Sequence, residues 1–222
     1  MTRSKRAKAV IERLARLYPD AHCELDFANP LQLLIATILS AQCTDVQVNK
    51  ITPALFAAYP TARDFAAANP LELESFVQST GFFRNKARNI QLAARDIVEK
   101  FGGEVPRTLA ELITLAGVGR KTANVVLGNA FGLDEGIVVD THVTRLSLRL
   151  RLTRMKTAEK IESDLIRLIP RIHWTVFSHW LIAHGRRICV ARNPRCHQCE
   201  LADLCPSAGC YGTSVPLSAS VS

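Results

Sequence analysis

The sequence predicts an all-α protein, and three observations lead to this prediction. Most of the chain divides into stretches with the length and apolar periodicity of amphipathic helices, of which residues 4–18 are the first. Asn29-Pro30 and Asn69-Pro70 each place a capping residue before a proline suited to the first helical position. Strand signals are nearly absent, because the only β-branched run, residues 137–139, is very short.

Several of the expected helices have a local reason to begin or to end. Asp45 can cap a helix that Pro53 would shorten or kink. Gly102-Gly103 can end a long helix, and Thr108 with Glu111 forms a capping-box pattern before a short one. The helices expected are, in chain order, 4–18, 30–40, 45–59, 71–78, 84–101, a short one ending at 115, 122–131, 141–150, 157–169 and 174–189.

Length and composition indicate a folded intracellular protein. A chain of 222 residues, 48% of them hydrophobic, can bury one good core or two small ones. No apolar run approaches membrane-spanning length, and the polar N-terminus lacks the apolar segment of a signal peptide. Of the seven cysteines, four are close together near the C-terminus, which argues against a disulfide framework and for a reducing compartment.

The charge is distributed unevenly along the chain. The net charge is +8, and residues 145–195 carry twelve Lys or Arg against three Asp or Glu, while residues 21–144 are slightly acidic. Residues 1–20 are also basic, so the two ends are expected to fold together as one domain. A basic surface suits a polyanion such as nucleic acid, although a merely solvated basic face is an equally good interpretation of charge alone.

A glycine turn between two expected helices is the first candidate site. Gly117-Val118-Gly119 permits positive φ and leaves backbone amides uncovered beside a helix N-terminus, which can bind one phosphate. Lys121 follows in the first turn of that helix, and Asp140 comes after the apolar run 137–139. Alone, a G-x-G turn is a weak signal, and Asp140 can equally be the N-cap of the next helix.

Four cysteines form the second candidate site. Cys189, Cys196, Cys199 and Cys205 are spaced C-x6-C-x2-C-x5-C, which is dense enough to indicate a metal centre. Four-thiolate zinc sites usually show two close pairs, and only Cys196 and Cys199 are close here. The wider loops favour a [4Fe–4S] cluster, with zinc as the alternative. The neighbouring arginines could then be held toward phosphates, and these are Arg186, Arg187, Arg192 and Arg195.

These motifs together resemble the endonuclease III family of DNA glycosylases. S-A-Q-x-T-D, L-A-G-V-G-R-K-T-A, V-D-T-H, H-G-R and the cysteine spacing occur in the family's order over residues 5–206. The resemblance implies a helix-hairpin-helix barrel domain at 23–133, an iron–sulfur domain from 1–22 and 134–210, and a loose tail at 211–222. It also implies a [4Fe–4S] cofactor and a monomer that acts in the bacterial cytoplasm. The partner would be double-stranded DNA with damaged bases or abasic sites, and the reaction removal of oxidised pyrimidines with strand cleavage.

Residue roles carried over from the family begin with Lys121 as nucleophile and Asp140 as its partner carboxylate. Because an attacking lysine must be neutral, the pKa of Lys121 is expected to be lowered by burial, by the neighbouring Arg120 and by the positive end of the helix. Gln42 resembles the residue that fills the space left by the extruded nucleotide, and Phe82 the one that wedges into the opposite strand. The full set implied to contact DNA is Gln42, Phe82, Arg84, Gly117, Gly119, Arg120, His142, Arg145, Arg186, Arg192 and Arg195; of these His142 and Arg145 are either structural or phosphate-contacting.

Two departures from the family pattern bear on specificity. Ala116 stands where the family usually has proline, and the loop at Phe82 is more aromatic and more basic than usual. Arg84, Lys86 and Arg88 suggest a phosphate-facing surface beside that loop. Within the same fold, an adenine-mismatch glycosylase would lack a lysine at position 121, whereas a thymine-mismatch enzyme differs only in its pocket. A non-catalytic, DNA-binding redox sensor would not need Lys121 and Asp140.

Overall fold

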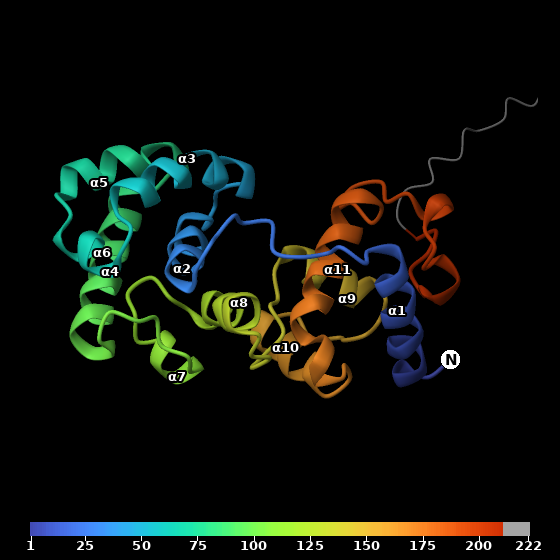
Figure 1. The fold of residues 1–222 in the computed structure, drawn as a ribbon. Helices are drawn as coiled ribbons and strands as arrows, with labels where there is room; N and C mark the ends of the chain where they lie inside the picture. Colours follow the sequence, from blue (N-terminus) through green and yellow to red (C-terminus); the bar gives the residue numbers. More distant parts are fainter. Residues whose placement is uncertain (211–222) are drawn as a thin grey trace, which may run out of the picture. The chain divides into compact units, whose positions relative to one another are not determined.

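The computed structural model describes residues 1–210, and the tail expected at 211–222 lies outside the described residues. Every secondary-structure element assigned within residues 1–210 is a helix, so the all-α prediction is confirmed (Figure 1). The described chain divides into two units. The middle unit is Cys23–Glu135, and the terminal unit combines Met1–His22 with the chain from Gly136 onward. The sequence analysis expected the first boundary at the same place, between residues 22 and 23. It expected the second between residues 133 and 134, two residues earlier than in the structure.

The middle unit is built around one apolar helix. All residues from Leu33 to Leu39 in α2 are buried, and α2 packs against α3, α6 and α8. A helix without a polar face must be surrounded by other helices. The elements of this unit are α2 (Pro30–Leu39), α3 (Asp45–Ala58), α4 (Ala62–Ala67), α5 (Pro70–Val77), η1 (Gln78–Thr80), α6 (Phe83–Phe101), α7 (Leu109–Leu112) and α8 (Arg120–Phe131).

Local chemistry explains where these helices begin. Thr44, rather than the expected Asp45, caps α3 by accepting from the Gln47 amide at 3.2 Å. Pro53 lies inside α3 without ending it. The six-residue helix α4, which the sequence analysis missed, begins at a capping box between Thr61 and Asp64.

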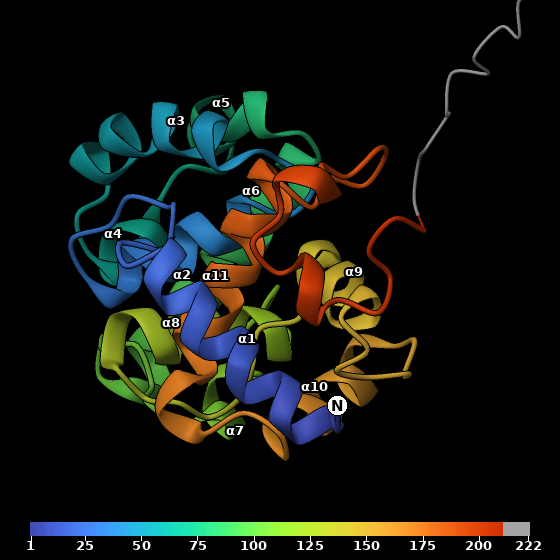
Figure 2. The same ribbon diagram turned by 90° about the vertical axis from the view of Figure 1, so that its right-hand side faces the viewer.

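In the terminal unit, helices from both ends of the chain share one core. Helix α1 packs against α11, and α11 packs against α9 (Figure 2). Leu14, Val143 and Phe177 are fully buried in the core that these helices share. The elements are α1 (Arg3–Leu17), α9 (Thr141–Arg149), α10 (Ala158–Ile166), η2 (Arg171–His173), α11 (Trp174–Arg187), η3 (Cys196–Gln198) and η4 (Ala202–Leu204). Residues 137–139 are buried but form no strand within the described chain. No helix in residues 1–210 is long and apolar enough to span a membrane.

Candidate functional site

The glycine turn joins α7 to α8 and requires one of its two glycines. Gly117 has φ +76°, and a Cβ there would lie 3.0 Å from the Asn89 side chain. The turn is closed by the Val118 amide, which donates to the Leu115 carbonyl at 3.1 Å, and Val118 is buried as the anchor of the turn. Gly117 therefore meets both a conformational and a packing demand that no other residue meets without strain.

Gly119 meets neither demand. Its φ of −92° is open to any residue, and a Cβ would meet nothing within 4 Å. It is the N-cap of α8, and no side chain caps the helix there. The start of α8 therefore has no side-chain cap, at the positive end of a twelve-residue helix. This arrangement can bind an anion.

Lys121 lies in the first turn of α8. Its side chain is exposed, and so is that of Arg120. The expected burial of Lys121 is wrong, because the second helical position after an open turn faces solvent rather than the core.

Gln42 and Phe82 occupy similar loop positions at the ends of helices. Both are exposed and both have left-handed backbone, with φ +55° at Gln42 and +48° at Phe82. Non-glycine residues seldom adopt this conformation, and it is concentrated at functional sites. Phe82 is 69% exposed, whereas its neighbour Phe83 packs against the core of the middle unit.

The phosphate-facing surface expected from Arg84, Lys86 and Arg88 is only partly present. Arg84 and Arg88 are exposed, and the Arg84 guanidinium lies 5.5 Å from the centre of the Phe83 ring. Lys86 is instead buried, at 4% exposure, with its ammonium bonded to two main-chain carbonyls. The reason is helical periodicity, since Lys86 shares the buried face of α6 with Ile90 and Ile97.

Asp140 lies in the terminal unit and caps α9. Its Oδ1 accepts from the Val143 amide at 2.7 Å, and the residue is half-buried. Asp140 is therefore the N-cap of α9, as the alternative interpretation predicted. The cap bond uses only Oδ1 of the carboxylate. Lys121 belongs to the middle unit and Asp140 to the terminal unit.

Arg145 and His142 are used within the terminal unit. Arg145 donates to the carbonyls of Cys189 and Gly185, at 3.1–3.2 Å, and its Nη2 lies 3.1 Å from His142 Nδ1. A Cβ on Gly185 would lie 2.7 Å from that same nitrogen, which explains the glycine of the H-G-R motif. Of the two roles expected for Arg145, the geometry favours the structural one, and phosphate contact by either residue stays a prediction.

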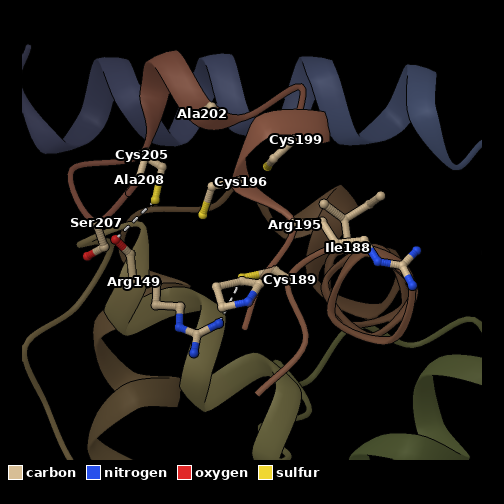
Figure 3. Close-up of a pocket in the computed structure, with 11 residues that line it drawn as sticks. Arg149, Ile188, Cys189, Arg195, Cys196, Cys199, Ala202, Cys205, Ser207 and Ala208 are labelled. Carbon is tan, nitrogen blue, oxygen red and sulfur yellow. Dashed lines mark hydrogen bonds between the residues drawn. The ribbon is translucent and has the colours of Figure 1, made fainter. Parts of the chain in front are cut away.

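The four cysteines line one cavity of the terminal unit. Their side chains come from the end of α11, from η3 and from the segment after η4, and Figure 3 shows them turned toward a common space. Among residues 1–210, no three His, Cys, Asp or Glu side chains are grouped closely enough to hold a single metal ion. Four cysteine side chains around one cavity can supply the thiolate ligands of an iron–sulfur cluster.

Buried polar groups surround these thiols. Arg149 donates to Cys189 Sγ at 3.3 Å and to the carbonyls of Val190 and Ala191, so it shapes the loop after the first cysteine. His184 lies between the Tyr18 hydroxyl, at 2.8 Å, and Cys199 Sγ, at 3.4 Å. Arg149 and Tyr18 were not singled out from the sequence, and His184 entered only as part of the H-G-R motif, because a buried polar partner is recognisable only once the packing is known.

Burial disfavours charge on the cysteine thiols. It raises the pKa of Cys199 to about 11 and raises that of Cys205 as well. Four thiolates in such a place require a compensating cation, which iron in a cluster supplies. The donor set and its setting therefore fit a cluster. The four arginines expected beside it are all exposed, and these are Arg186, Arg187, Arg192 and Arg195.

Comparison with known proteins identifies the family. Residues 35–171 match the model of the HhH-GPD superfamily of base excision DNA repair proteins. Residues 189–205 match that of the iron–sulfur binding domain of endonuclease III. Endonuclease III of Synechocystis sp. is 56% identical over 93% of this chain and 94% of its own. The chain belongs to the endonuclease III family. Endonuclease III of Escherichia coli (strain K12) is 43% identical over 92% of this chain and 96% of its own.

Solved structures agree with this assignment. An endonuclease III in a non-covalent DNA complex superposes with a TM-score of 0.88 at 45% identity, covering 94% of this chain and 97% of its own. A trapped covalent endonuclease III–DNA intermediate gives the same TM-score and identity, covering 94% and 98%. A thermostable thymine-DNA glycosylase, at 23% identity, shares the fold with a TM-score of 0.83.

As a member of the endonuclease III family, the protein is a DNA glycosylase and AP lyase of base excision repair. Its cofactor is a [4Fe–4S] cluster. The fold, the family and the cofactor predicted from the sequence are thereby confirmed. The roles of individual residues are taken up next as proposals.

Proposed function

We propose that this protein excises oxidised pyrimidines from duplex DNA, with Lys121 as nucleophile and Asp140 as the stabilising carboxylate. The observation that carries the proposal is the hairpin. Gly117 holds the turn in its left-handed conformation, and α8 presents Lys121 beside uncapped amides. A phosphate bound by those amides would bring a nucleotide within reach of an amine one residue into the helix.

The proposed chemistry proceeds through an imine. The Lys121 Nζ forms a bond to C1′ as the bond from C1′ to the base nitrogen breaks, and the departing base takes up a proton. Positive charge that develops at C1′ is stabilised by the free oxygen of Asp140. The nitrogen then loses a proton and the C1′–O4′ bond breaks, with O4′ taking up a proton, which opens the sugar ring and gives the imine. The imine acidifies the C2′ proton. Its loss drives β-elimination of the 3′-phosphate, and water finally releases the lysine.

A base must leave the stack before this reaction, and the loops supply the proposed means. Unstacking costs a few kcal/mol, and side chains that enter the gap offset part of that cost. Gln42 and Phe82 are exposed and held in strained backbone at loop tips, as such roles require. Gln42 is proposed to fill the vacated space, and Phe82 to wedge into the opposite strand.

Phosphate contacts are proposed for five of the exposed arginines, namely Arg84, Arg120, Arg186, Arg192 and Arg195. Arg149 and the cysteines organise the loop that carries Arg192 and Arg195, so cluster binding and DNA binding are proposed to be linked through that loop.

The proposed catalytic residues and the cysteines lie on one chain, which supports a monomer. The bacterial sources of the relatives support action at DNA in the cytoplasm.

The test is a cleavage screen with covalent trapping. Duplexes that each carry one lesion are incubated with the holoprotein and borohydride, which reduces an imine to a stable covalent complex. We expect trapping on oxidised pyrimidines by the native protein and none by Lys121→Gln, because an amide cannot form the imine. Arg120→Gln, a neighbouring change that leaves the amine, should still be trapped. Equal trapping by Lys121→Gln would exclude Lys121 as nucleophile, and preferred cleavage at G·T mispairs would assign the protein to thymine-mismatch repair.

A further inference from the structure

Lys86 is a buried cation in the middle unit with no role in the proposed chemistry. Its Nζ donates to the carbonyl of Leu39 at 2.7 Å and to that of Thr80 at 2.7 Å. The side chain is 4% exposed, and burial lowers its pKa. Burying an ammonium group is costly, so a folded chain keeps one there only where its partners repay the desolvation.

The two acceptors lie at comparable places in the fold. Leu39 is the last residue of α2, and Thr80 is the last residue of η1. Carbonyls at helix ends have no partner within the helix, and a cation at that end is stabilised by the helix dipole. The Lys86 ammonium therefore provides a hydrogen-bond donor for the terminal carbonyls of both helices. Because both carbonyl oxygens bond the same nitrogen, they lie close to each other.

Each of these helix ends leads directly into a left-handed loop residue. Gln42 follows Leu39 by three residues, and Phe82 follows Thr80 by two. A second hydrogen bond links the helix that follows the Gln42 loop to the helix that precedes Phe82. Gln47 Nε2 of α3 donates to Ser79 Oγ of η1 at 2.7 Å. The loops that bear Gln42 and Phe82 are thus tied at their bases by side chains from α6 and α3.

We propose that Lys86 is a positioning residue that holds these two loops at a fixed spacing, so that Gln42 and Phe82 enter the duplex as one unit. The proposal rests on the roles proposed above for Gln42 and Phe82. Its physical basis is preorganisation, because loops that are already in register lose little conformational entropy when they insert. Without the tether, each loop must find its place on the DNA separately.

The central variant is Lys86→Met, which keeps an unbranched chain of similar length and removes the donors. The matched control is Lys100→Met, the same change on α6 at an exposed lysine that pairs with Asp96. Should Lys86→Met fail to fold, Lys86→Gln replaces it. Glutamine is uncharged and one bond shorter, so its amide donors reach the two carbonyls less well than the lysine ammonium does.

Three measurements distinguish positioning from plain structural support. Single-turnover excision from fully paired duplex should fall roughly 10- to 100-fold for Lys86→Met, as expected for a misplaced group. Excision opposite a one-nucleotide gap, where little stacking remains to be broken, should change much less. Amide exchange should accelerate at residues 40–43 and 80–83 and stay unchanged in α8.

The decisive measurement is a mutant cycle of Gln42→Ala and Phe82→Ala on paired duplex. In the native background their effects should be non-additive, and in the Lys86→Met background they should add. Coupling of equal size in both backgrounds, or equal losses on paired and gapped substrates, would overturn the role of Lys86. If Gln42→Ala and Phe82→Ala both leave excision unchanged in the native background, the proposed insertion itself fails, which is a separate result.

Discussion

Replacement of Phe82 by alanine separates insertion into DNA from support of the fold. The ring is 69% exposed, and Phe83 rather than Phe82 packs against the core of the middle unit. Surface changes of this kind usually alter the free energy of unfolding by less than about 0.5 kcal/mol. Phe82→Ala should therefore melt within a few degrees of the native protein.

The expected loss of activity follows from base stacking. An aromatic side chain stacked on a base is worth about 1–3 kcal/mol, which corresponds to roughly 5- to 150-fold in rate or affinity. Excision from paired duplex should fall within that range for Phe82→Ala. Excision opposite a one-nucleotide gap should fall far less, because the target base there has already lost most of its stacking.

A second substitution at Phe82 uses the backbone conformation. The φ of +48° costs a non-glycine residue about 1–2 kcal/mol in the folded state, and glycine avoids this cost. Glycine also raises the entropy of the unfolded chain, which offsets part of that gain in stability. Phe82→Gly should therefore be as stable as the native protein, or more stable by up to about 1 kcal/mol, and yet be as defective on paired duplex as Phe82→Ala.

The matched control and the refuting result are well defined. Leu71 is 77% exposed in the same unit, and no role in DNA binding is proposed for it, so Leu71→Ala should leave both excision and melting unchanged. Excision is measured under single-turnover conditions and melting by calorimetry. If Phe82→Ala melts many degrees lower and loses activity equally on paired and gapped substrates, Phe82 supports the fold and the insertion role is refuted.

Three further predictions concern the hairpin, the carboxylate and the cluster. Gly119→Ser should cap α8 and raise stability by a few tenths of a kcal/mol, while it weakens binding to duplex DNA in a fluorescence titration; unchanged affinity would mean that no phosphate approaches Gly119. Asp140→Asn should keep the N-cap bond to Val143, and hence the fold, and lower excision by about 10²–10³. Activity that persists would leave Asp140 with capping alone. Purified protein should be yellow-brown with about four irons per chain, Cys199→Ser should lose the absorbance, and stoichiometric zinc in anaerobically prepared native protein would contradict the cluster.

Much of the fold and part of the site could be read from sequence, because the deciding interactions are local. A helix cap acts within about three residues, so Asn29-Pro30 and Thr108 marked helix starts that the structure contains. The cysteine spacing indicated a cluster for a similar reason, since neighbouring ligands along the chain enclose one cavity. Helix α4 was missed because six residues are too few to show a period.

Side-chain burial could not be predicted in the same way, because it depends on what packs against a residue from elsewhere in the chain. Lys86 resembled a surface residue among Arg84 and Arg88, but one of its acceptors is Leu39, 47 residues away. The exposure of Lys121, the pairing of His184 with Tyr18 and the contacts of Arg149 behind Cys189 were likewise decided by tertiary packing. The sequence by itself determined most of the helices, because caps and periods are encoded within short segments, and its combined motifs indicated the family and, through it, the cofactor. Only the folded chain determined which charged groups are buried, because desolvation and its compensation depend on neighbours brought together across the core.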